Sequence, residues 1–147
     1  MTILALILAA ALAAQATDKG TTVRVFVFTP TANASSTPSP DEQGRLDAVS
    51  DMREALERKK GITLVADRAE ANVTMEVVGR EQREEPSGGF GGKSVTRMGD
   101  TIIRLRVRAG DEESDIKGMG QGTWGRAAKD AADRFVKWIA RREPKRI

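Results

Sequence analysis

The residue types that most often carry catalysis are missing from this chain. It contains no histidine, no cysteine and no tyrosine. Without histidine and cysteine there can be no Ser-His-Asp or Cys-His nucleophilic site, no thiol redox chemistry and no ordinary zinc site. The chemistry that remains open is that of carboxylates and arginines.

Acidic residues occur in several groups, and their spacing raises the question of a hydrolase. The groups are Glu84 with Glu85, Asp111 to Glu113, and Asp130 with Asp133. A glycosidase needs two carboxylates across a cleft, one of which has a raised pKa. Each group here falls in a predicted turn or on a polar helix face, which favours solvated surface. A carboxylate-dependent hydrolase is kept as the first alternative function. No D-x-D-x-D-G calcium loop occurs, and we expect no metal.

A glycine-rich segment comes close to a phosphate-binding loop. Residues 87–94 read SGGFGGKS, which matches the pattern G-x-x-x-x-G-K-[ST] except that Ser87 replaces the first glycine. A phosphate-binding loop leads into a helix whose amino end holds the phosphate. Here the segment leads towards a predicted strand instead. We therefore expect a hairpin connection around Phe90 and no nucleotide or other cofactor.

A row of arginines is the best candidate for a binding surface. In the segment from Thr101 to Ala109, Arg104, Arg106 and Arg108 alternate with Ile103, Leu105 and Val107, so that the arginines share one face of a strand. We expect Arg80, from a neighbouring strand, to join this row. With Phe90, these residues form the candidate binding face.

Two interpretations of the arginine row remain open. The row could bind phosphate, an acidic glycan or an acidic protein. It could also be an ordinary solvent face on which arginines pair with acids of neighbouring strands, such as Glu76. Nucleic acid is not expected, because no aromatic residues for base stacking lie between the basic ones.

The elements that must position these residues follow from hydrophobic periodicity. Strands are predicted at residues 23–28, 62–65, 72–83, 101–109 and 114–121, and amphipathic helices at residues 44–60 and 123–142. Residues 29–43 and 84–99 are predicted to be mobile connections. The order β-α-β-β-β-β-α predicts an α+β fold, with a mainly antiparallel sheet of about five strands and two helices packed on one face.

The first residues resemble a secretory leader. Residues 3–14 read ILALILAAALAA and are followed by Ala14-Gln15-Ala16, although no lysine or arginine precedes the apolar run. The run is shorter than the roughly 20 residues of a membrane-spanning helix. We predict a signal peptide at residues 1–16 and a single domain at residues 17–147. The product would be periplasmic or extracellular, with no stable membrane anchor after cleavage.

Three segments resemble a family of envelope domains. These are DAVSDMREALERKKGITLV, DRAEANVTMEVVG and AAKDAADRFVKWIA. Their pattern is similar to the small α/β domain of periplasmic TolB amino-terminal regions and of the curli-secretion CsgG family. The resemblance implies envelope assembly or interaction rather than catalysis, and it transfers no functional residue.

These observations lead to one expected function. We expect a non-enzymatic, exported binding or scaffolding module whose partner is an envelope protein or an acidic ligand. A second alternative is a polyanion or nucleic-acid binder, whose affinity would fall steeply with salt. The patterns do not indicate an oligomeric state.

Overall fold

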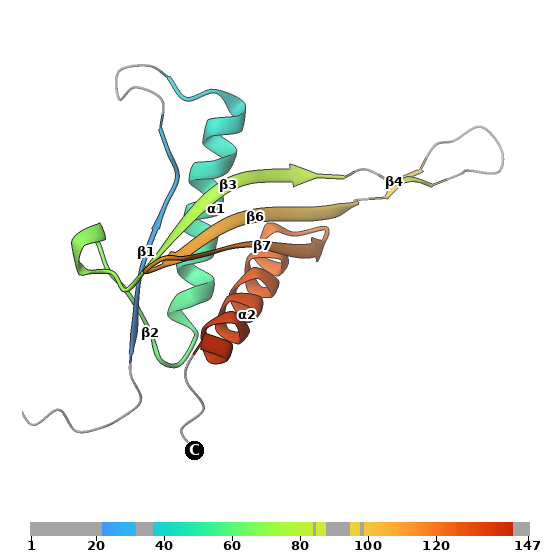
Figure 1. Cartoon of the computed structure of the whole chain (residues 1–147). Coiled ribbons are helices and arrows are strands. Elements are labelled where there is room, and N and C mark those ends of the chain that lie inside the picture. The colour runs from blue at the N-terminus through green and yellow to red at the C-terminus, as the bar shows by residue number, and fades with distance from the viewer. Residues whose placement is uncertain (1–21, 32–36, 84, 88–94, 98, 143–147) are drawn as a thin grey trace, which may run out of the picture.

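The computed structural model describes residues 22–31, 37–83, 85–87, 95–97 and 99–142 (Figure 1). The predicted leader at residues 1–16 lies outside these residues. The elements, in chain order, are β1 (Val23–Phe28), α1 (Pro40–Glu57), β2 (Ile62–Leu64), the short 3-10 helix η1 (Arg68–Glu70), β3 (Val73–Gln82), β4 (Glu85–Ser87), β5 (Val95–Arg97), β6 (Asp100–Ala109), β7 (Glu112–Gln121) and α2 (Trp124–Arg142). The predicted α+β class and element order are confirmed, with β4 and β5 as additions.

The main sheet has five strands in the order β2-β1-β3-β6-β7. β3, β6 and β7 pair antiparallel, whereas β1 is parallel to both β2 and β3. The sheet is therefore mixed, with antiparallel pairing between its long strands and parallel pairing at β1. Val25 of β1 is level with Leu64 on one side and with Val73 on the other. The connection that contains η1 consequently has to cross β1 to reach β3.

Helix α1 begins earlier than the sequence pattern predicted. Its cap is Ser39, whose hydroxyl accepts a hydrogen bond from the Glu42 main-chain N–H at 3.2 Å. Pro40 follows, where its fixed φ and missing N–H suit the start of a helix. Residues 40–43 are therefore helical rather than part of the predicted mobile connection at 29–43, because the cap and the proline act before the apolar stripe begins.

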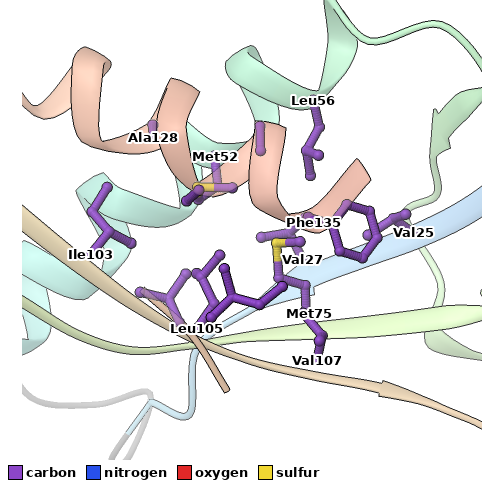
Figure 2. Packing of buried hydrophobic residues seen from close by; sticks show 14 of the residues in the cluster. Val25, Val27, Met52, Leu56, Met75, Ile103, Leu105, Val107, Ala128 and Phe135 are labelled. Carbon is purple, nitrogen blue, oxygen red and sulfur yellow. The ribbon is translucent and has the colours of Figure 1, made fainter. Parts of the chain in front are cut away.

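The hydrophobic core lies between the sheet and the two helices (Figure 2). Alternate residues of the central strands point to this side, among them Val25, Met75 and Leu105. Met52 of α1 and Phe135 of α2 meet them and are fully buried. Both helices thus cover the same face, as predicted, because each presents its apolar stripe to the same row of strand residues.

Helix α2 packs on β7 unusually closely. A Cβ atom placed on Gly118 would lie 2.3 Å from the Ala127 carbonyl oxygen and 2.5 Å from the Ala131 Cβ. A Cβ on Gly120 would lie 2.5 Å from the Ala127 nitrogen. The two glycines and the alanines of α2 therefore allow main chain to approach main chain, which side chains would prevent.

A β-bulge in β3 changes which face the later residues take. Glu76 is opposite Arg106 and Val77 is opposite Leu105, but Gly79 rather than Val78 is opposite Arg104. Val78 is thus one extra residue, and every residue after it changes sides relative to simple alternation. Arg80 is opposite Ile103, whose side chain belongs to the core.

The hairpin of β3 and β6 continues into a second, two-stranded sheet formed by β4 and β5 (Figure 1). This ribbon occupies part of the predicted mobile segment 84–99. Residues 88–94, with Phe90, lie outside the described residues. In the described part of the chain, no helix is both long and apolar enough to cross a membrane.

The close α2–β7 contact gives a test of the packing. We predict that Gly118→Ala lowers the free energy of unfolding by about 3 kcal/mol, because the new methyl group overlaps α2 main chain that cannot move independently. Gly125→Ala is the matched control, since a Cβ at Gly125 meets nothing within 4 Å. This control should be neutral or stabilise by up to about 1 kcal/mol. Urea unfolding of both variants provides the measurement, and equal effects would contradict the packing.

Candidate functional site

The face of the sheet opposite the helices carries most of the predicted binding residues, and we call it the open face. Sheet register arranges it in rows that run across the strands. One row contains Phe28, Glu76, Arg106 and Asp115, from β1, β3, β6 and β7. The neighbouring row consists of Phe26, Thr74, Arg108 and Glu113. The structure therefore brings Arg104, Arg106 and Arg108 together on one face, as the alternation predicted.

Each arginine of this row pairs with an acid on a neighbouring strand. Arg104 Nη2 lies 3.1 Å from Glu81 Oε1, and Arg106 Nε lies 3.4 Å from Asp115 Oδ1. Arg108 pairs with Glu113, and the hydrogen bond from Arg108 lowers the pKa of the Glu113 carboxyl below its ordinary value. The acids are Glu81, Glu113 and Asp115 rather than the predicted Glu76. The row is consequently balanced in charge.

The open face also carries apolar side chains. Val78 and Met119 are 40% and 38% exposed, and these are the exposed large hydrophobic residues in the part of the chain that the structure describes. Val78 joins Arg104, Arg106 and Lys117 around a shallow hollow of about 160 Å³. Ile102, near the β4–β5 ribbon, is fully buried. Val78 and Met119 are therefore the apolar side chains that this face exposes, whereas Ile102 adds nothing to its exposed surface.

An aromatic cluster occupies the β1 end of the open face. The rings of Phe26 and Phe28 stack with centroids 5.5 Å apart. The Arg68 guanidinium of η1 lies 4.3 Å from the Phe28 centroid, which places the β2–β3 connection over this face. The sequence analysis did not single out these residues. The signal that could have found them is that β1 has apolar residues on both of its faces, Val25 and Val27 on one and Phe26 and Phe28 on the other.

Arg80 does not belong to the open face, which corrects the prediction. Because of the bulge at Val78, its side chain lies on the helix side, where it is 14% exposed. The Arg80 guanidinium lies 3.9 Å from the Trp124 ring centroid, and Nη1 lies 3.2 Å from Asp47 Oδ2. Nη2 lies 3.9 Å from Asp51 Oδ2. Arg80 thus ties the base of the long hairpin to both helices.

The carboxylates give little support to a hydrolase. Asp130 pairs with Arg134, and Asp133 pairs with Lys59 and Lys129. Glu112 pairs with Arg142 at the far end of the same helix. In the described residues, no group of three acidic, histidine or cysteine side chains is placed to hold a metal.

One carboxyl does have a raised pKa. Burial raises the pKa of Asp51 above its ordinary value, although the nearby Arg80 charge opposes the shift. Asp51 borders a cavity of about 240 Å³ between α1 and α2, together with Glu54 of the same helix. The two acids are three residues apart on one helix, whereas the hydrolase alternative needs carboxylates on opposite sides of a cleft.

The Arg80 cluster leads to a prediction about Asp51. Arg80→Met should raise the pKa of Asp51 further. The variant loses the positive charge that lowers this pKa, whereas the burial of Asp51 that raises it is kept. It should also reduce the free energy of unfolding by about 1–3 kcal/mol, since hydrogen bonds to charged groups disappear. The carboxyl carbon of Asp51 can be titrated by NMR. Arg104→Met, on the open face, is the control and should leave the pKa of Asp51 unchanged.

The Lys59–Asp133 pair leads to a pH-dependent prediction. The hydrogen bond from Lys59 lowers the pKa of Asp133 below its unfolded value of 3.8. The stabilisation that the ionised Asp133 gives the folded chain is therefore complete well above pH 3.8. It is lost as the pH falls through the pKa of Asp133 in the folded chain. Asp133→Asn should lower the free energy of unfolding by up to about 1 kcal/mol at pH 7. The difference from the parent chain should vanish near pH 2. A difference that persists in acid would contradict this assignment.

Comparisons with known proteins identify similar folds only at a distance. No family model matches the chain, and no curated protein matches it. Solved structures that are similar to it include two bacterial lipoproteins. A minor lipoprotein from Acinetobacter baumannii has 12% identity and a TM-score of 0.41, covering 82% of this chain and 94% of its own. An uncharacterized lipoprotein B from Nitrosomonas europaea has 10% identity and a TM-score of 0.40, covering 80% and 81%. The resemblance to TolB and CsgG domains stays a prediction.

Proposed function

We propose that this chain is a non-enzymatic, exported module of the cell envelope that binds another protein through its open face. One observation carries the proposal. The two exposed large hydrophobic residues of the described chain, Val78 and Met119, lie on the helix-free face among arginine–carboxylate pairs. Protein interfaces are enriched in arginine, methionine and aromatic residues, and the open face has this composition.

The geometry of the open face suits a protein partner. Its side chains project from strands of a hydrogen-bonded sheet, so that binding would order few additional main-chain residues. The arginines are already held by acids and keep donors for a partner, because a guanidinium carries five N–H groups. Phe26 and Phe28 extend the surface towards β1.

The charge balance of this face disfavours the polyanion alternative. Arg104, Arg106 and Arg108 each have a carboxylate within ion-pair distance. A polyanion would have to displace or repel these carboxylates, whereas a protein with both charge signs could exchange pairs with them. The apolar run at residues 3–14 and the following Ala14-Gln15-Ala16 support export, and hence an envelope location.

The proposal is tested by placing charge on the open face. We expect Val78→Glu/Met119→Glu to lose a partner that the chain of residues 17–147 captures from an envelope extract. The measured affinity for that partner, once purified, should fall at least about tenfold, because acids would replace apolar contacts. Ser50→Glu/Ala140→Glu is the control, since it adds the same charge at exposed positions of the two helices.

Two outcomes would overturn the proposal. The first is equal capture by both double variants, which would place binding elsewhere. The second is retention of the chain on heparin with affinity that falls steeply with salt, which would favour the polyanion alternative. Circular dichroism of each variant separates loss of binding from loss of fold.

A further inference from the structure

We propose that the outer edge of β7 accepts an extended acidic segment of a partner protein as a sixth strand. The acidic side chains of that segment would enter the groove between β7 and α2. This edge is distinct from the open face, so the proposal does not depend on the function proposed above.

The main chain of β7 has a free hydrogen-bonding edge. The Met119 N–H donates to Asp130 Oδ2 at 2.9 Å, so this N–H points away from β6. In an antiparallel strand, the N–H and C=O of one residue point to the same side, and alternate residues share that side. The main-chain N–H and C=O groups of Glu113, Asp115 and Lys117 must therefore also point away from β6. The hydrogen bonds of the described residues include none to their main-chain groups.

The length of this edge fits a short added strand. Asp130 occupies the edge at Met119, which leaves residues 113–117 open, about 17 Å at 3.4 Å per residue. The opposite edge of the sheet is β2, which has only three residues. Short edge strands resist pairing with another chain, whereas a long one invites it. Strand addition is thus expected at β7 rather than at β2.

A groove beside this edge supplies the specificity. A cavity of about 410 Å³ lies between β7 and α2 and is lined by Ser114 to Lys117 of the strand and by Asp130, Arg134, Lys137, Trp138 and Arg141 of the helix, among others. Asp130 is already bonded to Arg134, and Asp133 to Lys59. Lys137 and Arg141 form no ion pair with another described residue. The groove therefore offers two unmatched positive charges.

The spacing of these charges matches an extended chain. Lys137 and Arg141 are one helical turn apart, about 5–6 Å between their Cβ atoms. Alternate residues of a strand are separated by about 7 Å and point to the same face. Helix α2 runs along β7, because Ala127 contacts Gly120 and Arg142 pairs with Glu112. Two acidic residues at alternate positions of an added strand would thus face Lys137 and Arg141.

A second copy of the chain fits the edge less well. Antiparallel pairing of two β7 strands would place two α2 helices beside one another. Lys137 and Arg141 of each copy would then face the same pair of the other copy, and like charges repel. Charge complementarity instead favours an acidic segment, a mode of recognition in which main-chain bonds give affinity and side chains give specificity.

The experiment uses two peptide pools and the chain of residues 17–147. One pool contains nine-residue peptides with Asp or Glu at alternate positions and Val, Ile, Thr or Ser between them. The other has Lys or Arg at the same positions. We expect the chain to retain the acidic pool and not the basic pool. Amide exchange at Glu113, Asp115 and Lys117 should slow at least about tenfold when acidic peptides bind.

Two variants separate main-chain pairing from charge. Asp115→Pro removes an outward N–H without removing a bond to β6, and it also removes a negative charge. It should nevertheless weaken binding at least about tenfold. Lys137→Glu/Arg141→Glu should do the same through charge. Val78→Glu, on the open face, should bind the peptides normally, so that failure here is distinguished from failure of the proposed function.

The proposal fails if both pools are retained equally. It also fails if acidic binding survives Asp115→Pro as well as N-methylation of alternate peptide amides, since charge alone would then explain it. The N-methylated peptides serve equally if Asp115→Pro does not fold. A dimer that forms with rising concentration and is lost in Asp115→Pro would show that the edge takes a second copy instead.

Discussion

The contact of α2 with β7 is the constraint on which the other features depend. Gly118 and Gly120 let the helix main chain rest against the strand, closer than any side chain would allow. This close contact determines where Trp124 lies at the start of α2. It also places Asp130 beside the Met119 N–H and Arg142 beside Glu112. Since α1 and α2 also pack on one another over the same core, neither helix is available to cover the other face.

Charge is distributed differently on the two sides of the molecule. On the open face, arginines and acids from adjacent strands neutralise one another, and small apolar patches lie between them. On the helix side, Arg80 is held against Trp124 and two aspartates. Lys137 and Arg141 line the groove between β7 and α2, and neither forms an ion pair with another described residue. The first arrangement favours broad, reversible contact, and the second favours a narrow acidic ligand. Neither one resembles the paired carboxylates of a hydrolase.

The sequence predicted much of this because local periodicity reports burial. The alternation from Ile103 to Arg108 identified which side chains share a face, and the helical stripe of residues 123–142 identified α2. Three features escaped prediction. The parallel pairing of β1 depends on strand neighbours that are distant in the chain. The bulge at Val78 depends on the contacts of Arg80 with residues of the two helices, which are distant in the chain. The acids that pair with the arginines of β6 depend on the register between strands. Each is a long-range property that no short segment encodes.

The bulge at Val78 determines which residues of β3 face the core. From Val73 to Val77 the odd-numbered residues point into the core. After the extra residue Val78, the even-numbered Arg80 lies on that side of the sheet instead. Because Val78 is the residue of β3 without a partner on β6, losing it would leave Gly79 opposite Arg104 and Arg80 opposite Ile103, in a strand without the bulge. Insertions between Arg83 and Asp100 would leave both strands in phase. Related chains can therefore differ in hairpin length beyond Arg83, and they can lack the bulge residue without moving Arg80 to the open face.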